Sequence, residues 1–403
     1  MTDRRSPDES RDGLSLAVVA GLFVASLTLR PPVLAIGPLL PLIREDLGLP
    51  ASLAGLLTTI PVLCMGLFAP FGPRVASRLG PRTAFAVSTG LIAAMGVVRV
   101  LAPTYPLVLL ATFGIGIGIG IAGPIPSMVV ARRLPARLSL GTGAYAAGIT
   151  AGSALSAALA VPIAGSGGWR FSLLVMALVS FLAVGAWLAL VRGDDDATRA
   201  ASRAVRLPWR SGTAWVLAIV FGLQSVLFYG ATAWLPNAFV ERGWSPADAG
   251  GLVAASNGVA LITVIGVPLV ADRVRSRRPP ILVACVVTVI ALTLIAGAPE
   301  LAYPAVVILG LALGSLLSLV LTVPLDVSDD PARVGSISAL MLLGGYVISS
   351  TGPFLLGAAR DLTGNFAASL WLLVLAAVGM TLMALAIPSR EHQRAARVAV
   401  PPA

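Results

Sequence analysis

Apolar stretches long enough to cross a membrane follow one another along almost the whole chain, and this feature limits the possible folds more than any other. A helix needs about 20 mostly apolar residues to span the hydrocarbon core of a bilayer. Twelve such stretches fit between Leu14 and the polar tail that starts at Arg390. Because the chain is 57% hydrophobic and only 11% charged, a soluble fold of this size would expose large apolar surfaces. The sequence therefore predicts an all-α, multi-pass membrane protein with twelve transmembrane helices.

The expected spans fall into two sets of six. The first set occupies residues 1–192, the second occupies residues 211–403, and a polar cytoplasmic linker, 193–210, joins them. The spans in order are 14–42, 51–73, 81–102, 104–131, 138–164, 169–192, 211–240, 247–271, 279–298, 301–326, 333–360 and 364–388. The first span is longer than the apolar core of a signal peptide, so we expect it to be retained.

Arginine supplies all 28 basic residues, and its distribution predicts how the chain is oriented in the membrane. Most arginines lie in the two terminal segments and in the turns after even-numbered spans, whereas the opposite turns contain only Arg44, Arg170, Arg242 and Arg360. Positive charge favours the cytoplasmic side, so both termini are predicted to be cytoplasmic in a bacterial-type plasma (inner) membrane. The net charge of +10 is dispersed along membrane edges, where anionic lipid is a sufficient partner, and it does not indicate nucleic-acid binding.

An internal repeat relates the two sets of spans. Residues 41–78 align with residues 236–273 at a constant offset of 195, and further along the offset becomes 196. Matched pairs include Pro41 and Pro236, Gly48 and Gly243, Gly55 and Gly250, and Gly168 and Gly364. Two parallel six-helix halves that share a central cavity are typical of transporters that expose one site to each side of the membrane in turn. The pathway would lie within one chain, so a functional monomer is expected.

The turn after the second span carries a recognisable motif. Residues 73–82, PRVASRLGPR, resemble the signature G-x-x-x-D-R-x-G-R-R of the major facilitator superfamily, with Ser77 in place of the Asp. The copy in the second half keeps Asp272 and Arg273. The resemblance implies twelve helices in two pseudo-symmetric halves and a gate near this turn. Because Ser77 has no carboxylate, we expect Arg78, Asp272 and Arg273 to form the gate, with Asp272 as the acid.

A second set of segments is similar to a particular family of transporters. The seventh span contains GLQSVLFY at 222–229 and AWLP at 233–236, and the first contains LRPP at 29–32 and GPLLP at 37–41. Together these segments resemble the cyanate and 2-nitroimidazole transporter family over the whole chain. The resemblance implies import or export of a small planar or anionic solute.

Arg30 is the leading candidate for a substrate-binding residue. It lies well inside the first span, where an unpaired charge costs several kcal/mol. Arginine offers a fixed fork of donors that suits carboxylate, nitro or cyanate acceptors, and it does not lose its charge. Two structural alternatives are that Arg30 snorkels to the outer interface, or that it pairs with backbone carbonyls freed by Pro31 and Pro32, which lack N–H groups.

Other polar and aromatic residues inside the spans are candidates for the same site. By the offset of 195, Arg30 corresponds to Ser225, which places part of the seventh span at its depth. The further substrate-binding candidates are Gln224, Ser225, Phe228, Tyr229, Asn257, Tyr145 and Tyr346. Hydrogen bonds between helices and ordinary apolar packing are the alternative roles for each of them.

Two further features inside the spans are interpreted as structural. Arg99 is close to the end of the third span, so we expect it at the membrane interface. The glycine-rich segment 114–123 contains a formal G-x-G-x-x-G, but it lies within an apolar span rather than between a strand and a helix. We expect its small residues to allow close helix packing, with a kink at Pro124 and Pro126.

Several kinds of chemistry are excluded by what the spans lack. Cys64 and Cys285 lie in separate apolar spans and the one histidine, His392, is in the tail, so no metal or other cofactor is expected. The acids lie in turns or, for Asp326, near a span end, so none is placed at mid-membrane to relay a proton. No nucleophile and base converge, and an enzyme is therefore not expected.

The sequence thus favours a secondary active or facilitative transporter of a small anionic or nitro-bearing planar solute. We expect alternating access by rocking of the two halves, with Arg30 anchoring the substrate in a central cavity. The alternative is a broad-specificity drug-exporting antiporter of the same fold in which Arg30 is structural.

Overall fold

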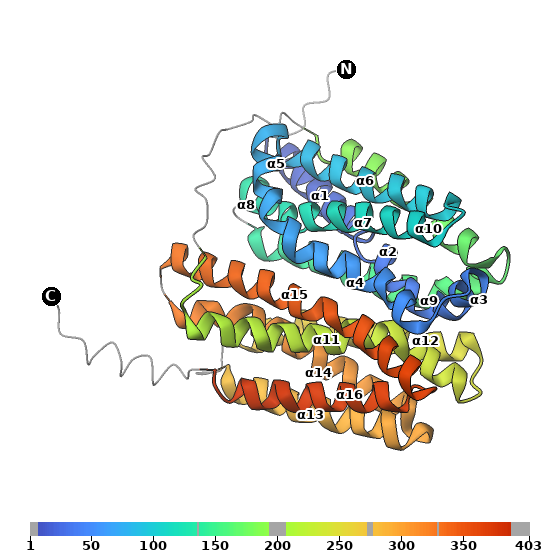
Figure 1. Cartoon of the computed structure of the whole chain (residues 1–403). Helices are drawn as coiled ribbons and strands as arrows, with labels where there is room; N and C mark the ends of the chain where they lie inside the picture. Colours follow the sequence, from blue (N-terminus) through green and yellow to red (C-terminus); the bar gives the residue numbers. More distant parts are fainter. Residues whose placement is uncertain (1–6, 135–136, 193–206, 272–276, 329, 388–403) are drawn as a thin grey trace, which may run out of the picture.

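The computed structural model describes residues 7–134, 137–192, 207–271, 277–328 and 330–387. The described chain is helical throughout, with short turns between the helices (Figure 1). Twelve of its helical segments are long and apolar enough to cross a membrane. The predicted fold class is therefore confirmed.

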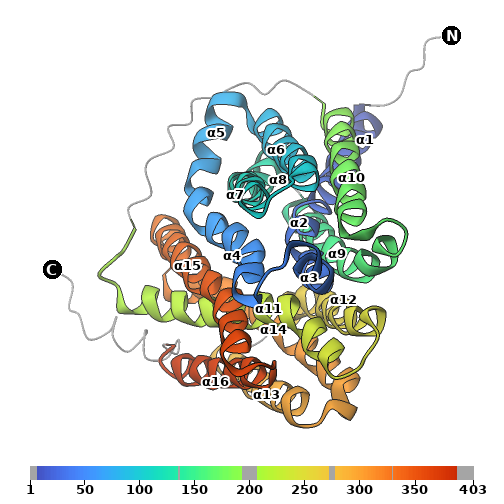
Figure 2. The same ribbon diagram turned by 45° about the vertical axis from the view of Figure 1, so that its right-hand side comes forward.

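The helices form two groups that lie against each other (Figure 2). The first group contains α1 (Pro7–Ser26), α2 (Pro31–Leu34), α3 (Ile36–Leu47), α4 (Ala51–Phe68), α5 (Gly72–Leu79), α6 (Pro81–Leu101), α7 (Tyr105–Ala122), α8 (Ile125–Arg133), α9 (Leu138–Ala164) and α10 (Gly168–Leu190). The second contains α11 (Gly212–Glu241), α12 (Pro246–Ala271), α13 (Arg278–Gly297), α14 (Ala302–Val327), α15 (Pro331–Thr363) and α16 (Ala367–Ala384). Short 3₁₀ helices precede α5 at Ala69–Phe71 and α14 at Pro299–Leu301.

The first span is broken, which corrects the expectation of one continuous helix over 14–42. Helix α1 ends at Ser26, and α2 begins at Pro31. Prolines at the first two positions of α2 have no N–H to give to the preceding turn, so the α-helical hydrogen-bond ladder cannot continue through this point. The interruption places Arg30 at the N-cap of α2 rather than in the middle of a helix.

The internal repeat is visible in the backbone conformation of matched glycines. Gly48 (φ 61°) follows α3 and Gly243 (φ 92°) follows α11, while Gly168 (φ 76°) begins α10 and Gly364 (φ 80°) precedes α16. Left-handed values of φ favour glycine because a Cβ would clash with the neighbouring carbonyl. The same turn geometry therefore recurs in both halves, at the offsets of 195 and 196 residues that relate them in the sequence.

The glycine-rich segment of α7 packs closely against α4, as expected. A Cβ on Gly116 would lie 2.8 Å from the Cβ of Cys64, and one on Gly120 would lie 2.5 Å from the Cys64 carbonyl oxygen. The kink expected at Pro124 is also present, since α7 ends at Ala122 and α8 begins at Ile125. These glycines serve helix packing.

The two groups touch closely at one end of the bundle, called here the distal side. It carries the turns at 48–50, 165–167, 242–245 and 364–366, away from the chain ends (Figure 1). There the Asn237 amide donates to the Gly37 carbonyl oxygen at 3.1 Å, from α11 to α3.

Candidate functional site

A cavity of about 80 Å³ lies between the two groups of helices. Its walls come from α9, α11, α12, α14, α15 and the break before α2. Seven of the eight substrate-binding candidates line it, namely Arg30, Gln224, Ser225, Phe228, Tyr229, Asn257 and Tyr346. The fold therefore gathers residues as far apart in the sequence as Arg30 and Tyr346 around one small space.

Arg30 faces the second half of the molecule. Its guanidinium donates to the hydroxyl oxygen of Tyr229 on α11 and approaches the sulfur of Met65 on α4 at 3.7 Å. The guanidinium carbon also lies 5.7 Å from the centre of the Tyr229 ring, close enough for a cation–π interaction. These contacts of the guanidinium with Tyr229 and Met65 make the Arg30 side chain part of the cavity wall.

Three tyrosines surround the guanidinium. Tyr145, Tyr229 and Tyr346 all interact electrostatically with Arg30. Tyr346 lies in the cavity wall, with its ring edge-on to Phe221 at a centroid distance of 5.3 Å. Tyr145 stands behind the wall, where its hydroxyl donates to the Gly123 carbonyl oxygen at 3.3 Å. Tyrosine hydroxyls supply dipoles but no full charge, so they stabilise the guanidinium without neutralising it.

The two amide side chains of the cavity, Gln224 and Asn257, differ in how many hydrogen bonds they form. Gln224 donates to the Leu313 carbonyl oxygen at 3.4 Å and accepts from the Ser225 hydroxyl at 3.2 Å. Asn257 is only 4% exposed, and its amide nitrogen has no hydrogen-bond partner in the described part of the chain. A buried donor without a partner costs about 1–3 kcal/mol. Asn257 is therefore the amide that is available to a solute.

Arg99 lies in the last turn of α6 and points into the bundle rather than toward its surface. Its place at the membrane interface stays a prediction. Arg99 is 2% exposed, and its guanidinium donates to the Pro32 carbonyl oxygen at 3.0 Å. Helix α2 ends at Leu34, so the Pro32 carbonyl lies in the last turn of a helix, where carbonyls have no donor within the helix. Arg99 supplies a donor from a neighbouring span.

Several cavity residues had not been singled out in the sequence. They are Thr150 and Ser153 on α9, Phe221 on α11 and Ser256 on α12. The hydroxyls of Thr150 and Ser153 donate to carbonyls of their own helix, at 2.9 and 2.8 Å. Small hydroxyl residues with this local bond are common in membrane helices, so composition alone gave no signal for them.

The charge of the cavity comes from one side chain. Among the residues that line the described cavity, Arg30 is the one that carries a charge, and the other polar groups are hydroxyls and amides. Asp326 lies on the C-terminal turn of α14 and is paired with Arg277. A solute in the cavity would therefore meet one cation and several hydrogen-bond donors.

The predicted gate cannot be assembled from the described residues. Arg78 is exposed on the last turn of α5. Asp272 and Arg273 lie outside the described residues. A gate formed by these three residues stays a prediction.

Comparisons with known proteins agree with this architecture. The family model of the Major Facilitator Superfamily matches residues 16–353. The chain is 30% identical to the cyanate transport protein CynX of Escherichia coli (90% of this chain, 95% of that protein). It is 29% identical to the 2-nitroimidazole transporter of the same organism (88% and 91%).

Solved structures show the same fold at low sequence identity. The D-xylose-proton symporter superimposes with a TM-score of 0.73 at 16% identity, over 94% of this chain and 98% of that one. The nucleoside transporter NupG gives a TM-score of 0.75 at 14% identity, over 93% and 99%. With twelve apolar spans, a central cavity and a family match over most of its length, the chain belongs to the major facilitator superfamily.

Proposed function

We propose that the protein transports a small anionic or nitro-bearing planar solute across a bacterial plasma membrane, with Arg30 as the anchor. The observation that carries the proposal is the position of Arg30, which lines the cavity beside tyrosines rather than beside an acid. A cation held inside a membrane protein is costly unless a counter-charge approaches it. An anion or a nitro group supplies that counter-charge at the place where the guanidinium donors point.

The other walls of the cavity suit a small flat solute. The free amide of Asn257 offers a second donor from α12, while Arg30 belongs to the first half. The rings of Phe221 and Phe228 provide apolar faces for a planar group. A solute held by Arg30 and Asn257 together would contact both halves at once.

The relatives support this solute class by their named substrates. One is named for cyanate and the other for 2-nitroimidazole. Cyanate is a small anion, and 2-nitroimidazole is a flat ring with a nitro group. Both carry the acceptor atoms that a guanidinium and an amide bind.

Transport by alternating access is part of the same proposal, and the two groups of helices around one cavity support it. The moving units are residues 1–192 and residues 211–403, which rock about the central cavity within a single chain. The distribution of arginines predicts that both termini are cytoplasmic, and in this orientation the distal side faces away from the cytoplasm.

The solute class can be tested by thermal shift of the purified protein, because a solute that binds the folded state stabilises it. The panel consists of cyanate, nitrite, acetate and 2-nitroimidazole, with bulky lipophilic cations as the comparison group. We expect small anions or the nitro compound to raise the melting temperature. Stabilisation by the lipophilic cations alone would contradict the proposal and favour the drug-exporting alternative.

Replacing Asn257 with alanine is expected to weaken solute binding without lowering the stability of the empty protein. The variant removes a buried donor that has no partner in the described chain, so the empty protein loses no hydrogen bond. A hydrogen bond to a charged group contributes about 1.5–3 kcal/mol, which corresponds to a loss of affinity of at least about tenfold. Isothermal titration with the best solute of the panel, together with the melting temperature without solute, measures both effects.

Asn365→Ala is the matched control for this prediction. The Asn365 side chain accepts from the backbone N–H of Ala367 in a distal turn, away from the cavity. It should leave the affinity unchanged. Equal affinities for wild type and Asn257→Ala would show that Asn257 does not contact the solute.

A further inference from the structure

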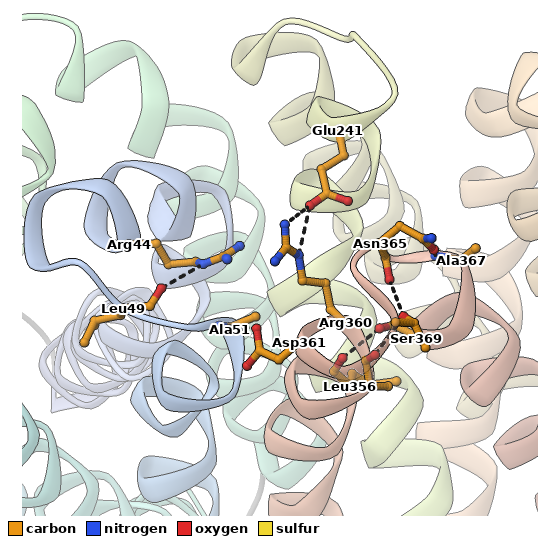
Figure 3. Close-up of polar contacts among 12 residues, drawn as sticks. Arg44, Leu49, Ala51, Glu241, Leu356, Arg360, Asp361, Asn365, Ala367 and Ser369 are labelled. Atoms are coloured by element: carbon orange, nitrogen blue, oxygen red, sulfur yellow. Dashed lines mark hydrogen bonds and ion pairs between the residues drawn. The ribbon is translucent and has the colours of Figure 1, made fainter.

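A carboxylate from the second half joins the first half on the distal side. Asp361, near the C-terminal end of α15, accepts the backbone N–H of Ala51 at 2.9 Å and that of Ser52 at 2.7 Å. These are the first two residues of α4. Figure 3 shows the Asp361 carboxylate turned toward Ala51, with α4 and α15 side by side.

Helix α4 has no cap of its own at this end. Its N-cap residue is Pro50, which has no side-chain acceptor for the first N–H groups. The N-terminus of a helix leaves several N–H groups unpaired and carries a partial positive charge. Asp361 therefore does what an N-cap aspartate ordinarily does, but it does so from the other half of the molecule.

A neighbouring ion pair leaves Asp361 free for this role. Arg360 adjoins Asp361 in sequence, and it donates to the carboxylate of Glu241 from two nitrogens, at 3.0 and 2.8 Å (Figure 3). Both residues belong to the second half, so this pair ties the end of α15 to the end of α11. The adjacent arginine is thereby engaged by Glu241.

The same face of α15 touches α4 at successive turns. A Cβ on Gly357 would lie 2.6 Å from the Ala51 carbonyl oxygen, and one on Gly55 would lie 2.6 Å from the Pro353 carbonyl oxygen. Residues 353, 357 and 361 are four positions apart and lie on one face of a helix. The carboxylate thus stands at the outermost point of a continuous backbone contact between the halves.

We propose that Asp361 is a positioning residue of the transport cycle, which holds the two halves together on the distal side and so favours the conformation described here. The inference rests on the proposed alternating access, because only a transporter whose halves separate on this side has to break the contact. Separation returns the Asp361 carboxylate and the Ala51 and Ser52 N–H groups to water. The helix cap is lost while the fold of each half is kept.

Loss of the carboxylate is expected to shift the conformational equilibrium by roughly tenfold toward separated distal ends, in line with the usual effect of removing a helix N-cap. The separation can be followed with nitroxide labels at Leu101→Cys and Leu362→Cys, one in each half. These leucines are 72% and 87% exposed on the distal side, whereas the native Cys64 and Cys285 are buried. Double electron–electron resonance then gives the distance distribution in nanodiscs without any solute.

Two variants weaken the contact in different ways. Asp361→Asn keeps the shape of the side chain but loses its charge and one acceptor. Pro50→Asp instead gives α4 a cap within its own half, in an extended backbone conformation that suits an N-cap. We expect both variants to enrich the longer distance, and Pro50→Asp to do so without lowering the melting temperature.

Asp46→Asn is the matched control. Asp46 is a distal aspartate whose partners, Trp169 and Arg170, belong to its own half. It should leave the distance distribution unchanged. The proposal is overturned if Asp361→Asn retains the wild-type distribution, or if Asp46→Asn shifts it equally. Because no solute is present, these outcomes are independent of the thermal-shift test of the Arg30 anchor.

Discussion

Replacing Arg30 with alanine is expected to abolish the stabilisation of the protein by its solute. The guanidinium supplies the charge of the described cavity wall, and Tyr229 beside it offers only a neutral hydroxyl. Loss of charge-assisted hydrogen bonds from a fork of donors should cost about 3 kcal/mol or more, which is a loss of affinity of at least about a hundredfold. Thermal shift and titration with the best solute of the panel measure the change.

The empty Arg30→Ala protein should remain folded, because the substitution removes a charge that no acid neutralises in the described cavity. Arg30→Lys should bind with intermediate affinity, since lysine keeps the charge but not the planar fork. Arg242→Ala is a suitable control: Arg242 donates to the carbonyl oxygens of Ile295 and Ala296 within the second half. Undiminished solute binding by Arg30→Ala would refute the anchor.

Replacing Gly37 with alanine is expected to force the two halves apart on the distal side. A Cβ at Gly37 would lie 2.0 Å from the Thr232 carbonyl oxygen and 3.1 Å from the Cα of Ala233. These are backbone atoms of α11, so no side chain can move aside. Overpacking of this kind costs about 1–3 kcal/mol, and here it acts against the conformation with closed distal ends.

The expected result for Gly37→Ala is a longer distance between labels at positions 101 and 362 and slower transport in proteoliposomes.

Gly152→Ala is a control that separates this effect from a general loss of stability. Its Cβ would lie 2.1 Å from the Leu27 carbonyl oxygen, a clash within the first half. It should lower the melting temperature but leave the distal distance unchanged. Gly90→Ala, with no atom within 4 Å of the added Cβ, should change neither. If the distance between the labels in Gly37→Ala is the same as in the wild type, the prediction is wrong.

The internal repeat was the most informative signal in the sequence. Its offset of 195 made Arg30 equivalent to Ser225 and so directed attention to the seventh span. In the structure Arg30 contacts Tyr229, one helical turn beyond Ser225. Symmetry brings the first span of each half face to face at the centre, so equivalent depths in the sequence become neighbouring positions in space.

The contact of Arg99 could not be predicted from the sequence. Its position near the end of a span suggested the membrane interface, and the structure adds that its guanidinium donates to the Pro32 carbonyl oxygen at 3.0 Å, beside the break in the first span. The prolines of that span were visible in the sequence. Which of the two arginines, Arg30 or Arg99, serves the break was not, because it depends on how the third span packs against the first.

The sequence by itself determined that the helices lie in lipid, how many spans there are, that the two halves repeat, and the family. These properties follow from the length of the apolar stretches and from a pattern that recurs along the chain. Only the tertiary structure decided which polar atoms stay unpaired, as for Asn257, and which helix ends receive a partner from the other half, as for Asp361 and α4. The physical reason is that a hydrogen bond is short and directional. Whether one forms is settled by the packing of helices hundreds of residues apart, which local composition does not encode.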